Sequence, residues 1–134
     1  MKENILIIDH EPFFREFALA SLEATGLFSV SACSNSRDGV RLIRTLAPAL
    51  VMLDVMLLSL SSNSGQRLLS CIRARDIPVI FLSSLLSMSD IGKAGISCSD
   101  GHVFLRKPVN EAEIISAVKS LIVTSPLTRH PVSL

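Results

Sequence analysis

Residues 49–58 read ALVMLDVMLL, a nearly continuous apolar run with a single carboxylate, that of Asp54, in its middle. A run of this kind, with Pro48 before it and a cluster of Ser, Asn and Gly after it, is typical of a strand buried on both faces. A desolvated, unpaired charge costs several kcal/mol, so the strand is predicted to end at about Leu53, with Asp54 at its carboxyl end. Ligands of open parallel α/β sheets bind at that edge. The alternative is a structural role for Asp54, as a helix N-cap or turn residue.

Size and composition limit the class of protein. The 134 residues are 49% apolar and carry a net charge of +1, which predicts one globular domain without a nucleic-acid surface. No window approaches the ~18 uncharged apolar residues of a membrane span. Residues 1–4 lead directly into a predicted strand, with no signal-peptide core, so a cytoplasmic location is expected. The three cysteines are odd in number and widely spaced, which favours reduced thiols.

Apolar periodicity divides the chain into alternating strands and helices. Strands are predicted at residues 4–8, 28–33, 49–53, 77–82 and 102–105. Helices are predicted from Pro12 to about Gly26 and at residues 36–46, 65–75, 87–96 and 110–122. This order implies a doubly wound parallel α/β sheet with right-handed crossovers and helices on both faces.

Local signals place several boundaries. Ser36 is the predicted N-cap of the second helix, and Asn110 with Glu113 forms a capping-box-like start of the last one. Residues 58–65 are predicted to form a Ser-rich loop. Residues 124–134 contain two prolines and are predicted to be a tail or linker that follows a domain of residues 1–123.

Polar residues follow four of the predicted strands. Asp9 and His10 follow the first, Asp54 the third, Ser83 the fourth and Lys107 the fifth. In the flavodoxin-like strand order 2-1-3-4-5 the first and third strands are neighbours, so the two aspartates are expected to meet. Close carboxylates repel unless a cation joins them, and oxygen ligands favour Mg²⁺. A lysine and a hydroxyl complete a pocket for a phosphoryl group, with Asp54 as the nucleophile.

From about Lys2 to Val123 the chain resembles the receiver domain of two-component response regulators, which has a CheY-like (βα)5 fold. The resemblance rests on four segments: the acidic turn after ILII, LVMLDVM around Asp54, PVIFLSS with Ser83, and FLRKP at residues 104–108. In addition, PFFRE at residues 12–16 resembles the NarL/FixJ branch, whose members usually carry a DNA-binding helix-turn-helix after the receiver.

The resemblance implies roles for the acidic residues. Asp54 would be the phosphoacceptor. Asp9, Asp54 and the main-chain carbonyl of Met56 would bind Mg²⁺, with His10 as a further candidate ligand and Mn²⁺ as an alternative metal. His10 replaces the family's usual second acid, so the alternative is that it is a solvent-facing turn residue without a metal role. Leu58 replaces a usual proline, and the next glycine, Gly65, comes about three residues late.

The resemblance also implies roles near the last strand. Ser83 and Lys107 would bind the phosphoryl group, Ser83 and Phe104 would form the switch, and the Lys107–Pro108 bond would be cis. The implied partners are a histidine kinase or phosphotransfer protein. A homodimer through the face of the fourth helix, fifth strand and fifth helix is also implied, as is a DNA-binding output domain after this chain. The chain itself is expected to bind neither nucleic acid nor membrane.

The leading hypothesis is therefore a phosphoacceptor signalling domain, not an enzyme, that belongs to a response regulator; regulation of transcription is the output that the NarL/FixJ resemblance implies. One alternative is a pseudo-receiver, an interaction module that is not phosphorylated. Another is a small haloacid-dehalogenase-like phosphatase with Asp9 as nucleophile, but neither Asp90 nor Asp100 has the acidic neighbour that this chemistry needs. A flavodoxin is disfavoured because no Ser/Thr/Gly phosphate loop follows the first strand.

Overall fold

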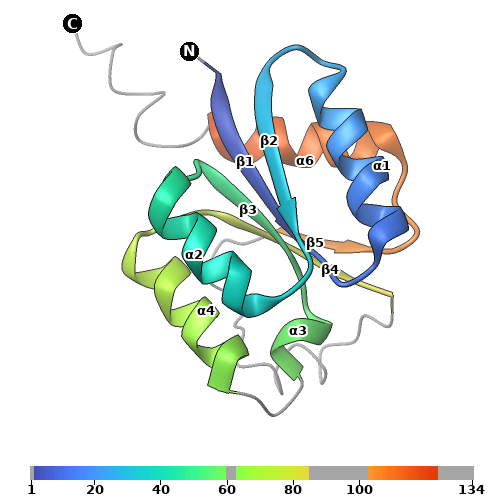
Figure 1. Cartoon of the computed structure of the whole chain (residues 1–134). Helices are drawn as coiled ribbons and strands as arrows, with labels where there is room; N and C mark the ends of the chain where they lie inside the picture. Colours follow the sequence, from blue (N-terminus) through green and yellow to red (C-terminus); the bar gives the residue numbers. More distant parts are fainter. Residues whose placement is uncertain (1, 60–62, 85–102, 124–134) are drawn as a thin grey trace, which may run out of the picture.

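Five parallel strands form one sheet in the order β2-β1-β3-β4-β5, with helices on both of its faces (Figure 1). This structure, a computed structural model, describes residues 2–59, 63–84 and 103–123. The strands are β1 (Glu3–Ile8), β2 (Phe28–Cys33), β3 (Leu50–Asp54), β4 (Val79–Ser83) and β5 (Val103–Arg106). The helices are α1 (Pro12–Glu23), α2 (Ser36–Leu46), α3 (Met56–Ser59), α4 (Asn63–Ala74) and α6 (Glu111–Val123). The predicted parallel sheet and its strand order are confirmed.

The central strands are buried on both faces, as their unbroken apolar runs require. Successive residues of β1 and β3 alternate between two cores. Leu6 and Leu53 pack beneath α2 and α4, whereas Ile7 and Met52 pack beneath α1 and α6. In the described part of the chain, no helix has both the length and the apolar character that a membrane span requires.

Two predicted helix starts have different outcomes. The capping box at α6 is confirmed, because the Asn110 N–H donates to Glu113 Oε1 at 2.9 Å and the Glu113 N–H donates to Asn110 Oδ1 at 2.8 Å. The prediction of Ser36 as an N-cap is wrong. The cap of α2 is Asn35, whose extended backbone lets its side-chain oxygen accept from the Asp38 N–H at 2.8 Å, and the buried Ser36 is already the first helical residue.

The prediction of one loop over residues 58–65 is wrong. The apolar run after Asp54 continues into the short helix α3, because Leu58 is buried in the core beneath α4. Helix α4 then begins at Asn63. Strand β3 also includes Asp54, one residue beyond the predicted end. The predicted helix at residues 87–96 and the predicted tail at 124–134 lie outside the described residues.

Gly65 of α4 lies close to the backbone of α3. A Cβ at this position would lie 2.7 Å from the carbonyl oxygen of Leu57 and 3.2 Å from the Cα of Leu58. Gly39 makes a similar approach, but only to a side chain, since its Cβ would lie 2.8 Å from Ile8 Cδ1. Backbone atoms cannot move away as a side-chain tip can, so the two glycines form a matched pair.

We expect Gly65→Ala to lower the free energy of unfolding by about 2 kcal/mol, within the range for overpacking. Alanine's helix propensity, favourable by roughly 1 kcal/mol, does not offset the backbone clash. Gly39→Ala should cost much less, because Ile8 can change rotamer while the same propensity gain applies. Urea denaturation of both variants measures the difference. Equal midpoints for the two variants would contradict this account.

Candidate functional site

Two buried carboxylates lie side by side at the carboxyl ends of β1 and β3. Ile8 pairs with Leu53 in the sheet register, so the next residues along, Asp9 and Asp54, occupy neighbouring positions. Both residues are almost completely buried, at 0% and 2% exposed. Asp9 Oδ1 accepts from the Glu11 N–H at 2.8 Å, and Asp54 Oδ1 accepts from the Met56 N–H at 3.0 Å. One oxygen of each carboxylate is thus held by the turn that follows its strand.

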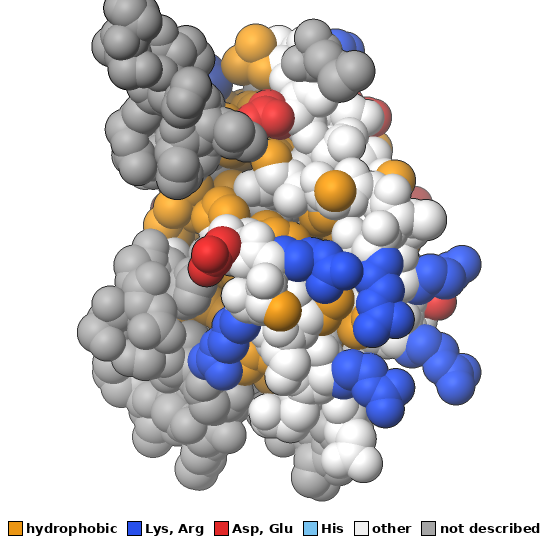
Figure 2. Space-filling model, turned by 90° about the vertical axis from the view of Figure 1, so that its left-hand side faces the viewer, with side chains coloured by type: hydrophobic (Ala, Val, Ile, Leu, Met, Phe, Trp, Pro, Cys, Tyr) orange, Lys and Arg blue, Asp and Glu red, His pale blue; other side chains and the backbone are white. Residues whose placement is uncertain are grey.

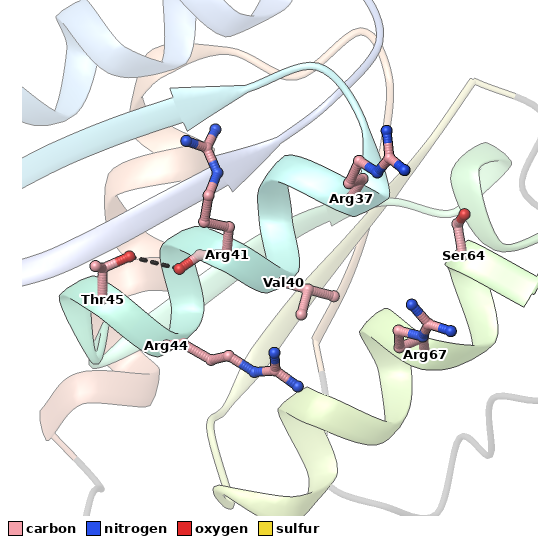
Figure 3. Close-up of a pocket in the computed structure, with 7 residues that line it drawn as sticks. All are labelled: Arg37, Val40, Arg41, Arg44, Thr45, Ser64 and Arg67. Carbon is pink, nitrogen blue, oxygen red and sulfur yellow. Dashed lines mark hydrogen bonds between the residues drawn. The ribbon is translucent and has the colours of Figure 1, made fainter.

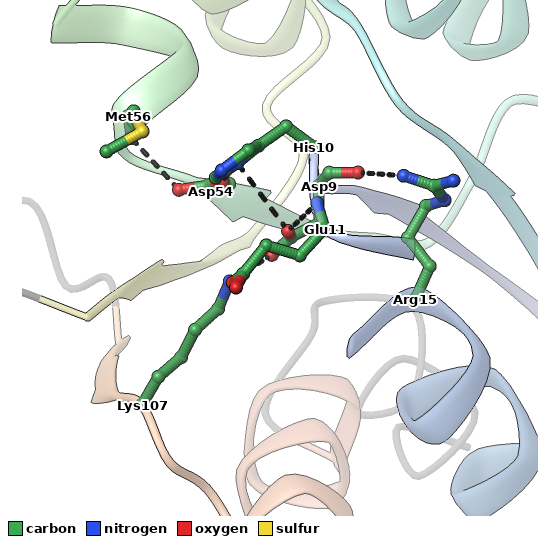
Figure 4. A network of polar contacts seen from close by, with 7 residues as sticks. All are labelled: Asp9, His10, Glu11, Arg15, Asp54, Met56 and Lys107. Carbon is green, nitrogen blue, oxygen red and sulfur yellow. Dashed lines mark hydrogen bonds and ion pairs between the residues drawn. The ribbon is translucent and has the colours of Figure 1, made fainter. Parts of the chain in front are cut away.

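Lys107 reaches this pair from the end of β5 (Figure 4). Its Nζ lies 2.7 Å from Asp9 Oδ2 and also forms an ion pair with the Glu11 carboxylate. Among the described residues Asp9 Oδ2 accepts no well-directed hydrogen bond, so this ionic contact is its main compensation. The Lys107 backbone N–H donates to the Ser83 carbonyl at 2.8 Å, which holds the ends of β4 and β5 together.

The charges at this site shift one another. Burial raises the pKa of Asp9; the Lys107 contact opposes this shift, and the nearby charge of Asp54 adds to it. Burial by itself would lower the pKa of Lys107, but its close contacts with the Asp9 and Glu11 carboxylates outweigh burial and raise it. The pKa of Glu11 is lowered by its hydrogen bond to Lys107. Lys107 is therefore held in its charged form at neutral pH.

His10 completes the cluster. Its Nδ1 contacts Asp54 Oδ2 and lies 3.9 Å from Asp9 Oδ1, although the side chain is 45% exposed. Figure 4 shows the ring turned toward Asp54. One ligand atom from each of these three residues lies within 4.8 Å of the others. Two carboxylate oxygens and an imidazole nitrogen in this arrangement fit a divalent cation.

The other predicted site residues lie at or near the same edge of the sheet. Ser83 ends β4 and is partly buried, and Met56 begins α3 with its side chain 43% exposed. Phe104 stacks on Phe81, with ring centroids 5.3 Å apart, and so packs toward the core rather than into the carboxylate cluster. The Lys107–Pro108 peptide bond is cis.

Two residues that sequence reasoning missed hold the cluster together. Glu11 shares Lys107 with Asp9, and Arg15 Nη1 donates to the Asp9 carbonyl at 2.7 Å. The acidic character of the turn after β1 was a signal for Glu11. Its partner is 96 positions away, however, and no local pattern identifies that pairing.

Comparison with known proteins places the chain in a family. Residues 5–119 match the family model described as the response regulator receiver domain. Among curated proteins, the response regulator Rre1 of Synechocystis sp. is 29% identical over 120 residues, which are 89% of this chain and 51% of that protein. The DNA-binding response regulator MtrA of Mycolicibacterium smegmatis is 25% identical, over 90% of this chain and 50% of that protein. The chain thus spans about half the length of these relatives.

Solved structures agree on the fold. The receiver domain of a LuxO repressor protein from Vibrio parahaemolyticus has a TM-score of 0.75 at 20% identity, with 98% of each chain covered. The receiver domain of a NarL response regulator from Mycobacterium tuberculosis has a TM-score of 0.74 at 21% identity, covering 92% of this chain and 98% of that one. At these identities the likeness shows the flavodoxin-like, CheY-like fold alone. With the family match over most of its length, this chain belongs to the response regulator receiver domain family.

Proposed function

We propose that this chain receives a phosphoryl group on Asp54 and so serves as the phosphoacceptor of a two-component response regulator. The observation that carries the proposal is the convergence of Asp54, Asp9 and the charged Lys107 at the ends of three strands. An oxygen of Asp54 attacks phosphorus, and the bond from phosphorus to the donor breaks with its electron pair leaving on the donor. Positioning and charge neutralisation dominate such a transfer, and Lys107 supplies positive charge at the site.

Receiver domains generally bind Mg²⁺ at an acidic pocket, and we propose that Asp9, Asp54 and the Met56 carbonyl hold it here. His10 is a further ligand. When bound, the metal neutralises charge that develops on the phosphoryl oxygens. Because His10 offers nitrogen and no negative charge, we expect Mg²⁺ to bind weakly and Mn²⁺ to be a better fit.

We further propose that residues 1–123 are the receiver domain and residues 124–134 a linker to an output domain. The phosphodonor would be a histidine kinase or phosphotransfer protein in the cytoplasm. An apolar groove of about 590 Å³ beside Lys107, lined in part by Phe13, Phe17 and Pro108, supports this partner. Phe13 is 85% exposed, and an exposed aromatic next to a reactive site is typical of a protein contact.

Intact mass and phosphate-affinity electrophoresis test the function. The 134-residue chain is incubated with acetyl phosphate and either Mg²⁺ or Mn²⁺. We expect addition of one phosphoryl group to the parent and none to Asp54→Asn, which keeps the shape of the side chain. If the folded parent gains no mass in either metal, or if Asp54→Asn gains it equally, the proposal fails.

The second candidate is a pseudo-receiver, and the His10 contact favours it. His10 Nδ1 contacts Asp54 Oδ2, and Glu11 forms an ion pair with Lys107, which would otherwise bind the phosphoryl group. Both contacts must open for phosphate to enter. The same mass measurement separates the candidates, since a pseudo-receiver stays unmodified.

We expect His10→Asp to bind Mg²⁺ about tenfold more tightly than the parent, a difference of about 1.4 kcal/mol. The substitution adds a hard, negatively charged oxygen ligand next to Asp9 and Asp54 and removes the imidazole from Asp54 Oδ2. Titration of Mg²⁺ followed by calorimetry measures the affinity. His10→Asn, which adds oxygen without charge, is the control. Equal affinities in all three proteins would mean that His10 is a turn residue with no metal role.

A further inference from the structure

A strongly basic pocket lies between α2 and α4, away from the carboxylate cluster. Its volume is about 590 Å³, and its lining includes Arg37, Arg41 and Arg44 from α2 and Arg67 from α4. Figure 2 shows Lys and Arg side chains gathered on the corresponding face of the molecule. In Figure 3 Arg44 of α2 and Arg67 of α4 lie near Val40, Ser64 stands at the start of α4, and Arg37 and Arg41 extend from the upper side of α2. The pocket contains none of the residues proposed to bind or accept the phosphoryl group.

The positions of the arginines follow from the helix period. Arg37, Arg41 and Arg44 are spaced i, i+4 and i+7, so they form one stripe on the exposed side of α2. Val40, three residues after Arg37 and four before Arg44, borders this stripe; it is buried in the core and forms the apolar floor. The pocket is therefore built on two packed helices.

The positive charge in this pocket is poorly compensated. Arg41 pairs with Asp38, its Nη2 lying 2.9 Å from Oδ1. In the described part of the chain, no salt bridge engages Arg37, Arg44 or Arg67. The whole chain has a net charge of only +1, so this concentration is a local feature. Neighbouring like charges repel, and a bound anion would relieve that repulsion.

The residue type and the shape indicate what kind of anion fits. All four cations are arginines, whose planar forks bind phosphate oxygens in bidentate fashion. The first turn of α4, at Ser64, adds the positive end of a helix dipole. The volume is in the range of small-molecule sites. Guanidinium groups from two helices can be engaged together only by a ligand with several separated anionic groups.

We propose that the α2–α4 pocket binds a small ligand that carries two or more phosphate groups, either a nucleoside polyphosphate or an inorganic polyphosphate. Extended nucleic acid fits less well, because the four arginines line a single pocket on a chain whose net charge is only +1. No aromatic side chain lines the pocket among the described residues, so the phosphates rather than a base carry the recognition.

Calorimetry on the 134-residue chain at about 0.15 M ionic strength, without divalent cations, tests the proposal. The probes are tripolyphosphate, ATP and inorganic phosphate. Tripolyphosphate is expected to bind at least about tenfold more tightly than inorganic phosphate, which can engage fewer forks. ATP that binds as tightly as tripolyphosphate identifies the phosphate chain as the shared determinant, and tighter ATP binding identifies a nucleotide ligand.

Variants locate the binding site. Arg44→Gln and Arg67→Gln, on opposite walls, should each weaken tripolyphosphate binding at least about fivefold, as loss of a charged hydrogen bond predicts. Arg67→Lys should also weaken it, because the charge stays but the fork is lost. Arg75→Gln is the matched control, an exposed arginine just after α4 and outside the pocket. Arg44, Arg67 and Arg75 are all exposed, and a thermal melt verifies that each variant folds.

Three results would overturn the proposal. One is the absence of saturable tripolyphosphate binding to the parent. Another is an equal loss of binding in Arg75→Gln, or a complete loss in Lys107→Ala, which would assign the binding to general charge or to the carboxylate cluster. The third is tighter, Arg67-dependent binding of an acidic peptide or a DNA duplex. Asp54→Asn should bind tripolyphosphate as the parent does, so this test is independent of phosphorylation.

Discussion

Lys107→Ala is expected to lower the free energy of unfolding by about 3 kcal/mol at neutral pH, as removal of one partner from a buried ion pair does. The lysine side chain is only 9% exposed and its partner Asp9 is fully buried. Without the ammonium group, the Asp9 carboxylate remains buried next to Asp54 and has lost its ion-pair partner. Urea denaturation measures the loss. Lys119→Ala, which removes an exposed lysine from α6, is the control and should change stability little.

The stability deficit of Lys107→Ala should change with pH in a defined direction. Burial already raises the pKa of Asp9 above its ordinary value of 3.8, and loss of Lys107 removes an opposing influence. An acid whose pKa is raised by folding destabilises the protein where it is ionised, so the deficit of Lys107→Ala should shrink as pH falls through the raised pKa. In the parent, folding raises the pKa of Lys107 above its ordinary value of 10.5, so the protonated lysine stabilises the folded state. This stabilisation is complete below the ordinary pKa and is lost as the pH rises through the raised pKa. A deficit that is independent of pH would refute the ion-pair explanation.

Lys107→Ala is also expected to accept a phosphoryl group from acetyl phosphate at least about a hundredfold more slowly than the parent. Loss of one electrostatic contact to the reacting group typically slows a reaction by about this factor. This expectation rests on the proposed function. The initial rate of mass increase at saturating Mg²⁺, on protein shown to be folded by circular dichroism, is the measurement. A rate within twofold of the parent would mean that Lys107 serves the fold and not the transfer.

Met56→Asn is expected to shorten the lifetime of phosphorylated Asp54 by about tenfold to a hundredfold. The Met56 side chain is 43% exposed and comes two residues after Asp54. Its thioether is a poor hydrogen-bond partner for an attacking water, whereas an amide can orient one. Groups that position a reacting water or move its proton contribute typically ~10²–10⁴-fold. The parent is therefore expected to hold its phosphoryl group for a long time.

Decay of the phosphorylated mass at saturating Mg²⁺ measures this lifetime. Met56→Leu is the matched control, since it keeps an apolar side chain of similar size and should decay as the parent does. Faster decay in both variants would point to general loosening of α3. No acceleration in Met56→Asn would show that another group already positions the water.

Much of the site could be predicted because its residues stand at strand ends. Residues 5–8 of β1, 50–53 of β3 and 79–82 of β4 are all apolar, a pattern typical of strands buried on both faces. The strand order then brings the carboxyl ends together, which is how Asp9 and Asp54 became neighbours. Whether they act as metal ligands and phosphoacceptor stays a prediction.

The errors came where local signals competed. Asn35 and Ser36 are both good N-cap residues, and only the extended backbone of Asn35 assigns the cap to it. The serines and Asn63 between residues 58 and 65 predicted a loop. The structure instead forms helix at both ends of that stretch, because burial of Leu58 outweighs local propensity.

The sequence by itself determined the class of fold, the positions of the strands and the set of polar residues at one edge of the sheet, because hydrophobic periodicity and turn chemistry act over a few neighbouring residues. Only the tertiary structure decided which of those residues touch. The contact of His10 with Asp54 joins positions 44 apart, and that of Glu11 with Lys107 joins positions 96 apart. The α2–α4 pocket likewise needs arginines from two helices. Charge pairing depends on distance through space, and it takes the folded sheet to set that distance.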